Sequence, residues 1–286
     1  MKCALTQGCS PFILAAVSLV CILIPSVSFG DGNPARIVSL APNITREIHD
    51  LGAAELLVGV TSYSPAGNGP PVEIVGSPAR INVEKTFSLR PQLVLASTDC
   101  NSRSDIEQLK RLGLTVHVFA GCESFACMCR TFEELGAMLG RSQRAGEVLA
   151  GVRAQLSAVQ GRIPGKDRPK VFWQLGENPL VTANSATFSG ELIRMAGCVN
   201  IFGDAPMHYP RVNVEEVVRR NPDVIVVVSQ MGSSSASATW DRFTTINAVS
   251  RKRVHVISAD LVCQPTPVMY LKGYKAVLAL LYPGVP

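Results

Sequence analysis

Short apolar runs alternate with amphipathic stretches along most of this 286-residue chain. Seven runs have the length and apolar content of buried strands, at 36–40, 58–60, 93–96, 116–119, 171–173, 224–228 and 254–257. Helical spacing of apolar residues lies between them, for example at 105–112. Strands that alternate with helices predict an α/β fold with parallel central sheets whose faces are covered by helices.

A long stretch without proline separates the strands of the first half from those of the second. Apolar residues keep near-helical spacing from 131 to 159, and a break is predicted around Gly140 to Ser142. We therefore predict an N-terminal α/β lobe at 31–141, one long connecting backbone helix at 142–165 and a C-terminal α/β lobe at 166–286. Such a connector would limit how far the lobes can close.

The N-terminus carries the pattern of an export signal. An uncharged apolar run occupies 12–24, and the small residues Ser28 and Gly30 stand three and one before a cut. The run has 13 residues, fewer than the roughly 20 that span a bilayer as a helix. We predict a signal peptide at 1–30, cleaved near Gly30, and a periplasmic protein. The alternative is a retained anchor, although bulky Val20 disfavours lipidation of Cys21.

The charge of the chain argues against two classes of partner. Removal of residues 1–30 takes away Lys2 and leaves 286 − 30 = 256 residues, with the formal charge falling from +5 to +4. This mild excess, without a dense block of Lys and Arg, gives no reason to expect nucleic acid or an anionic membrane as a partner.

Two segments of the chain repeat one another at an offset of 211 − 80 = 131 residues. Residues 80–95 and 211–226 share Arg, Asn, Val, Glu and Pro in register. In each copy the Asn is placed to begin a short helix, the Glu suits the helix dipole, and the Pro ends the helix before a strand. The offset is far longer than a solenoid period and suits two similar lobes. Glu84 and Glu215 therefore occupy equivalent exposed places.

Six of the nine cysteines remain after export, and an even number in an exported chain favours disulfides. Cys100 and Cys122 follow strands that are expected to be neighbours, so this is the first predicted pair. Cys198 with Cys263 is the second. The alternative is a thiolate metal site formed by Cys122, Cys127 and Cys129 with Cys100, but the spacing is irregular and an oxidising compartment favours disulfides.

The order of several motifs resembles the substrate-binding proteins of ABC importers for cobalamin, haem and ferric siderophores. The residues that carry the resemblance are 37–43, 57–61, 82–84, 90–94, 196–202 and 221–225. The resemblance implies two lobes joined by a single backbone helix, with a ligand cleft between the lobes. It also implies that Glu84 and Glu215 dock onto arginines of the two permease subunits. The alternative is that both merely favour the start of a helix.

Within this family the cobalamin binders are the most similar, through 61–64 and through Tyr209 with Pro210. The resemblance places Tyr63 and Tyr209 in the cleft, where a corrin requires broad, mostly apolar and aromatic walls. Where such proteins can place a tryptophan, this chain has Ser77-Pro78-Ala79. Pro78 is therefore a candidate contact at this position.

Further candidates follow predicted strands, because ligands of open α/β sheets bind beyond the carboxyl ends of the strands. The full set of predicted ligand-binding residues is Tyr63, Pro78, Cys100, Leu175, His208, Tyr209, Gln230 and Cys263. His208 could ligate cobalt or iron, since imidazole suits both, but a lone loop histidine is more often solvated.

We predict an exported, non-catalytic, monomeric receptor that delivers a corrinoid to an ABC permease dimer with its ATPase subunits. No resident metal and no catalytic cofactor are expected. The first alternative changes the cargo to haem or a ferric siderophore, for which Arg80 and Arg211 are candidate contacts. A hydrolase or thiol oxidoreductase is disfavoured because the sequence has no Gly-x-Ser-x-Gly, His-Glu-x-x-His or Cys-x-x-Cys motif. A metal-sensing protein or metallochaperone that uses the cysteines is a third alternative.

Overall fold

The computed structural model of the protein describes residues 33–65, 71–163, 168–229 and 238–282. The predicted signal peptide at 1–30 and the candidate Gln230 lie outside these ranges. None of the helices within the described ranges combines the length and the apolar character that a membrane span requires.

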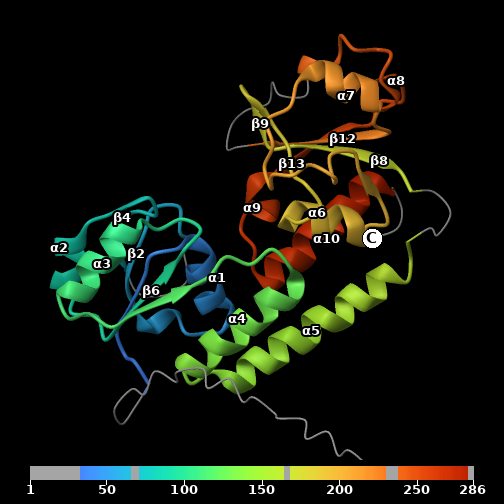
Figure 1. The fold of residues 1–286 in the computed structure, drawn as a ribbon. Helices are drawn as coiled ribbons and strands as arrows, with labels where there is room; N and C mark the ends of the chain where they lie inside the picture. Colours follow the sequence, from blue (N-terminus) through green and yellow to red (C-terminus); the bar gives the residue numbers. More distant parts are fainter. Residues whose placement is uncertain (1–32, 66–70, 164–167, 230–237, 283–286) are drawn as a thin grey trace, which may run out of the picture. The chain divides into compact units, whose positions relative to one another are not determined.

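The first lobe, which carries the labels β2 and β6 in Figure 1, is built on a five-stranded parallel sheet in the order β3-β2-β1-β6-β7. Its strands are β1 (Ile37–Ser39), β2 (Leu57–Val60), β3 (Glu73–Ile74), β6 (Leu93–Ser97) and β7 (Val116–Phe119). The central strands β1 and β6 are buried along their whole length, with Ile37 opposite Leu93. Burial on both faces explains why these strands read as unbroken apolar runs.

Short helices and one small hairpin complete the first lobe. They are α1 (Pro42–Asp50), the 3-10 helix η1 (Ala54–Leu56), α2 (Val83–Ser88), α3 (Arg103–Arg111) and the antiparallel strands β4 (Gly76–Ser77) and β5 (Arg80–Ile81). Helix α3 buries Ile106 and Leu109 in the same apolar cluster as Val94 of β6. The apolar residues at helical spacing therefore form the face that covers the sheet.

The second lobe contains a four-stranded parallel sheet in the order β11-β8-β12-β13. Its strands are β8 (Lys170–Gln174), β11 (Val199–Asn200), β12 (Val224–Ser229) and β13 (Val254–Ser258), and β9 (Gly176–Glu177) with β10 (Leu180–Val181) forms a separate hairpin. The helices are α6 (Phe188–Met195), α7 (Val214–Arg220), η2 (Ala238–Trp240), α8 (Asn247–Ser250), α9 (Ala259–Val262) and α10 (Pro267–Leu281). The predicted α/β fold with two parallel sheets is confirmed.

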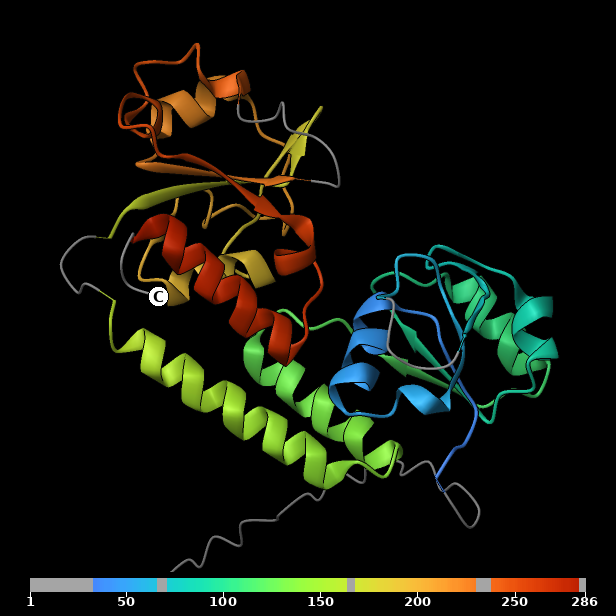
Figure 2. The same ribbon diagram turned by 180° about the vertical axis from the view of Figure 1, so that it is seen from behind.

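Two longer helices, α4 (Phe125–Met138) and α5 (Ser142–Gln160), lie in the chain between the two sheets. They meet at the predicted break, where Gly140 adopts a φ of +65°. A Cβ added at Gly136 would lie 2.7 Å from the Cβ of Ala145, so glycine permits the close approach of α4 and α5. Helix α5 runs beside α10 (Figure 2). Leu156 of α5 and Tyr274 of α10 belong to one buried cluster.

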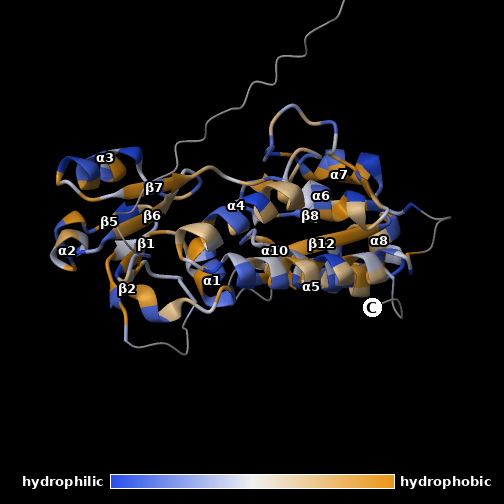
Figure 3. Cartoon of the chain, turned by 90° about the horizontal axis from the view of Figure 1, so that it is seen from below, coloured by the Kyte–Doolittle hydropathy of each residue, from blue (hydrophilic) through white to orange (hydrophobic). Residues whose placement is uncertain are grey.

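The two lobes differ in the side chains that fill their cores. Large aromatic side chains that are fully buried in the second lobe include Trp173, Trp240, Tyr270 and Tyr274, whereas aliphatic residues dominate around β1 and β6. Strands β6 and β12 are both drawn in the hydrophobic colour in Figure 3. Trp173 of β8 is fully buried and belongs to the core of the second lobe.

Candidate functional site

The loops at the carboxyl ends of the first sheet are tied together by Asn101, a residue that the sequence analysis missed. Its side chain is 9% exposed. Asn101 Nδ2 donates to the carbonyl oxygens of Leu40 at 2.8 Å and of Pro78 at 2.9 Å, and Oδ1 accepts from Ser97 N at 2.8 Å. The end of β6, the end of β1 and the turn that carries Pro78 are therefore held by one amide. A single polar residue after a strand gives no sequence signal for such a role.

Tyr63 stands on the loop after β2 and is 72% exposed. Its φ of +69° lies in the left-handed region, which is uncommon for an aromatic residue. The loop is held on both sides, because Ser62 N donates to Gly76 O at 2.8 Å and the hydroxyls of Thr45 and Ser64 lie 3.2 Å apart. Strain of this kind, supported by surrounding contacts, clusters at binding sites.

Tyr209 belongs to an exposed loop that precedes α7, and 53% of the residue is exposed. The loop is fixed by its backbone: Asn184 N donates to His208 O at 2.9 Å, and Thr182 N donates to Pro210 O at 3.1 Å. Residual burial raises the pKa of Tyr209, and the charges of Glu123, Asp99 and Cys263 raise it further. Glu123 and Asp99 come from the chain around β6 and β7, so both halves of the protein contribute groups near Tyr209.

Polar contacts join segments that precede α5 to segments that follow it. His208 Nδ1 lies 2.9 Å from Glu123 Oε1. Phe125 N donates to Glu191 Oε2 at 2.7 Å, and Arg46 Nη2 donates to Gln264 Oε1 at 3.0 Å. His208 thus lies beside a carboxylate, which is an ion pair when the imidazole is protonated.

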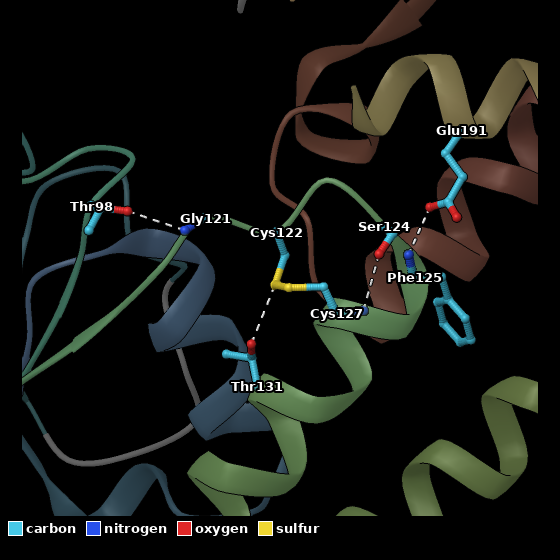
Figure 4. The surroundings of a disulfide bond; sticks show 8 residues. All are labelled: Thr98, Gly121, Cys122, Ser124, Phe125, Cys127, Thr131 and Glu191. Carbon is cyan, nitrogen blue, oxygen red and sulfur yellow. Dashed lines mark hydrogen bonds between the residues drawn. A yellow bond between two sulfur atoms is a disulfide. The ribbon is translucent and has the colours of Figure 1, made fainter. Parts of the chain in front are cut away.

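The disulfide of the described residues joins Cys122 to Cys127, so the predicted Cys100–Cys122 pair is wrong (Figure 4). The strands before Cys100 and Cys122 are neighbours as expected. However, the chain turns back immediately after β7 into α4, which brings the Cα atoms of Cys122 and Cys127 to 5.5 Å. Ser124 caps α4 inside this small loop by accepting from Cys127 N at 3.3 Å.

The predicted Cys198–Cys263 bridge is also wrong, because both residues are free thiols in the described chain. Cys198 is buried just before β11, with its Sγ 3.5 Å from the Tyr282 hydroxyl. Cys263 is exposed and follows α9, after β13. Since β11 and β13 form opposite edges of the sheet, the two thiols lie too far apart to bond.

Cys100 is a half-buried free thiol in the turn after β6. Burial raises its pKa to about 11, and the charge of Asp99 adds to this effect. The thiol is therefore protonated at neutral pH and is a poor metal ligand. Within the described ranges no group of three or more His, Cys, Asp or Glu side chains is arranged to hold a metal ion.

The remaining predicted residues occupy varied positions. Pro78 is half-buried in the turn between β4 and β5. Leu175 follows β8, but it packs against the core of the second lobe and its N donates to Val181 O at 2.8 Å. Trp240 packs in the core of the second lobe, and its Nε1 donates to Gln174 Oε1 at 2.8 Å.

The two repeated helices each present an exposed glutamate. Asn82 caps α2 and Asn213 caps α7, and in each helix the Glu is the second residue. Glu84 lines a surface hollow of about 570 Å³, and Glu215 lines one of about 690 Å³. Equivalent places in the two lobes therefore combine a carboxylate with a depression of the surface.

The chain matches known proteins over most of its length. The family model described as periplasmic binding protein matches residues 37–261. An uncharacterised ABC transporter substrate-binding lipoprotein of Bacillus subtilis (strain 168) is 31% identical over 257 residues, which cover 87% of this chain and 81% of the relative.

Solved structures share the fold. The periplasmic vitamin B12 binding protein of Vibrio cholerae superposes with a TM-score of 0.74 at 27% identity, covering 87% of this chain and 97% of the other. A possible iron-binding, periplasmic solute-binding protein from Staphylococcus epidermidis ATCC 12228 superposes with a TM-score of 0.79 at 23% identity, covering 88% and 100%. The second likeness bears on the fold alone.

Proposed function

Because the chain belongs to the periplasmic binding protein family, we propose that it captures a corrinoid outside the cytoplasm and delivers it to an ABC permease. It is a substrate-binding protein of the ABC transporter type and not an enzyme. The similarity to a vitamin B12 binding protein at 27% identity supports a corrinoid as the cargo.

The observation that carries the proposal is the pair of exposed tyrosines on anchored loops. Tyr63 and Tyr209 leave large aromatic faces open to solvent, while hydrogen bonds hold the backbone on each side of them. Preorganised aromatic faces bind a broad, mostly apolar ring without a large cost in ordering. A corrin has such a ring.

Delivery would use the two repeated helices. Glu84 and Glu215 are exposed, and each would meet a basic group of one permease subunit while the ligand is held between the lobes. Two charged contacts far apart in the sequence would orient the receptor on a two-subunit partner. The energy for transport would come from the ATPase subunits.

Haem or a ferric siderophore is the second candidate cargo. The imidazole of His208, which precedes Tyr209 in the sequence and can ligate iron, favours it. Arg80 and Arg211 lie at exposed positions and would have to reach an anionic siderophore.

The test is a visible-absorption titration of the purified exported protein with cyanocobalamin and with hemin, checked by calorimetry. We expect one-to-one binding of cyanocobalamin, weakened about tenfold to a hundredfold in Tyr63→Ala and in Tyr209→Ala, since a buried aromatic contact contributes about 1.5 to 3 kcal/mol. Phe87→Ala is the matched control, because Phe87 is also a large exposed aromatic residue but lies on α2. Binding of hemin alone, or of neither ligand, would refute the corrinoid proposal.

A further inference from the structure

Two carboxylates from neighbouring strand ends lie close to Tyr209. Asp99 follows β6, and its carboxylate lies against the backbone of Gly121 after β7, where an added Cβ would come within 1.9 Å of Asp99 Oδ1. Glu123 is two residues further along and reaches His208 Nδ1 at 2.9 Å. Because His208 precedes Tyr209, the contact of Glu123 places this acid beside the Tyr209 loop. Burial raises the pKa of Tyr209, and the charges of Glu123 and Asp99 raise it further.

Little positive charge offsets these two acids among the described residues. His208 faces Glu123 and is charged only when it is protonated. The guanidinium of Arg46 on α1 is bound elsewhere, because both its Nε and its Nη2 donate to Gln264 Oε1. No Lys or Arg is among the groups that shift the pKa of Asp99, which burial and Glu123 raise.

A third acid lies behind Asp99. Glu47 of α1 is 2% exposed. It lines the same small cavity of about 10 Å³ as Asp99, Cys122 and Pro265, which has room for about one water molecule. Burial raises the pKa of Glu47 well above its ordinary value. Burial therefore favours the neutral form of Glu47, which provides no positive charge to offset Asp99.

We propose that Asp99 and Glu123 determine cargo specificity, by accepting hydrogen bonds from peripheral amides of the ligand and repelling ligands whose periphery is anionic. This inference rests on the proposed function and narrows it. A corrin carries neutral carboxamides, whose N–H groups can donate to both carboxylates. Haem carries two propionates, and many siderophores are anionic, so each would place like charges together. Building repulsion against competitors is an effective route to specificity.

The sharpest probe is a pair of ligands that differ by one charge. Cyanocobalamin and its monocarboxylic acids, in which one peripheral amide is hydrolysed, have nearly the same shape. We expect the wild-type protein to bind at least one monocarboxylic acid about tenfold more weakly than cyanocobalamin, as one uncompensated like-charge contact would require. Asp99→Asn should reduce this discrimination most, because His208 partly offsets Glu123, and Asp99→Asn with Glu123→Gln should abolish it.

Hemin gives an independent readout with the same variants. The double variant should bind hemin about tenfold more tightly than the wild-type protein, while Glu107→Gln, which removes an exposed charge from α3, should change neither measurement. Thermal unfolding of each variant checks that it folds, and Asp99→Asn keeps the shape of the side chain.

The outcomes separate the two proposals. Equal affinity of the wild-type protein for the amide and for every monocarboxylic acid would overturn the role of the acids while leaving a corrinoid receptor intact. Absence of cyanocobalamin binding would overturn the proposed cargo, and the hemin measurement would then decide the role of the acids. Tight hemin binding by the wild-type protein would refute the role of Asp99 and Glu123. Unchanged hemin affinity in the double variant would refute it as well.

Discussion

In the first lobe Asn82 caps α2 by accepting from Lys85 N at 2.9 Å, and in the second Asn213 caps α7 by accepting from Glu216 N at 2.8 Å. The contacts that follow these matching caps differ. Lys85 Nζ pairs with Glu73 of β3 at 2.9 Å. Glu216 instead pairs with two arginines of its own helix, which hold its pKa at about 2.

The ion pairs of α2 and α7 therefore differ, although the two helices begin in the same way. Each lobe anchors its helix with its own ion pairs, whereas the Asn cap and the exposed Glu recur in both. An exposed Glu in the first turn suits the dipole, but this effect contributes only about 0.3 to 1 kcal/mol. The exposed Glu recurs in both lobes, but the ion pairs around it do not. This favours a role for Glu84 and Glu215 outside their own lobes.

Removing both glutamates would have the largest effect on function. Glu84→Gln with Glu215→Gln should lower ligand-dependent stimulation of the permease ATPase by about tenfold or more, because two charged contacts at an interface are lost. Ligand affinity should stay unchanged. The measurement is ATPase activity of the reconstituted transporter against receptor concentration.

The matched control for this pair is Glu107→Gln with Glu147→Gln, which removes two exposed charges elsewhere. The single variants Glu84→Gln and Glu215→Gln would show whether the two glutamates contribute equally to stimulation of the ATPase. Full stimulation by the double variant Glu84→Gln with Glu215→Gln would contradict the docking proposal and leave the helix dipole as the explanation of both residues.

The disulfide marks a second difference, since the described part of the second lobe has none. Cys122→Ser with Cys127→Ser should lower the free energy of unfolding by about 2 kcal/mol, the value expected for a short closed loop. Chemical denaturation measures this change. Cys263→Ser, at an exposed free thiol, should change it by less than about 0.5 kcal/mol. Equal effects of the two changes would show that the disulfide does not stabilise the turn into α4.

Glu47 makes the stability of the first lobe depend on pH. Its folded-state pKa is raised well above its ordinary value because the side chain is buried, and Asp50 adds to the effect. The folded protein therefore binds this proton more tightly than the unfolded chain does. The contribution of Glu47 is fully present below the unfolded pKa of about 4.3 and is lost as pH rises through the raised folded value.

Glu47→Gln should therefore raise the melting temperature at pH 8 and have little effect near pH 4. Melting curves across this range test the sign. Glu147→Gln on the exposed face of α5 is the control, and it should give curves parallel to those of the wild-type protein. A destabilising effect of Glu47→Gln at pH 8 would show that an ionised Glu47 is stabilised by a contact.

The smallest effect concerns the residue before each repeated proline. Arg90 has a φ of +47° and Asn221 a φ of +46°, so both copies turn through the left-handed region. Arg90→Gly should stabilise the protein by about 0.5 to 1 kcal/mol, because glycine adopts this conformation without steric cost. Asn221→Gly should destabilise it by about 1 kcal/mol, because Asn221 Oδ1 accepts from Asn247 N at 2.8 Å. Denaturant unfolding measures the change in the free energy of unfolding for each variant. A change of the same sign in both variants would contradict this explanation.

The central strands were predictable because they are buried on both faces. The runs predicted at 93–96 and 224–228 correspond to Leu93–Ser97 and Val224–Ser229. A central parallel strand needs apolar residues at every position, so its sequence identifies it without knowledge of its neighbours. The hairpin of β9 and β10 was missed, because each of its strands has only two residues, which is too short for a strand pattern to be recognised.

The candidate site was predictable only in part. Loops after strands could be named, and Tyr63 and Tyr209 are exposed there. The amide of Asn101, which joins three loops, and the packing of Leu175 into the core depend on segments far apart in the chain. A polar or apolar residue at the end of a strand has the same sequence pattern whichever way its side chain points.

By itself, the sequence determined the α/β class, the duplicated helix and strand unit with its two glutamates, and the resemblance to a family of receptors. These follow from patterns among neighbouring residues, and local patterns survive without the rest of the fold. Tertiary structure alone decided that Cys122 bonds Cys127 and that Asp99 and Glu123 lie near Tyr209. Cysteine pairing and the local electric field depend on distances between atoms, and only the folded chain sets those distances.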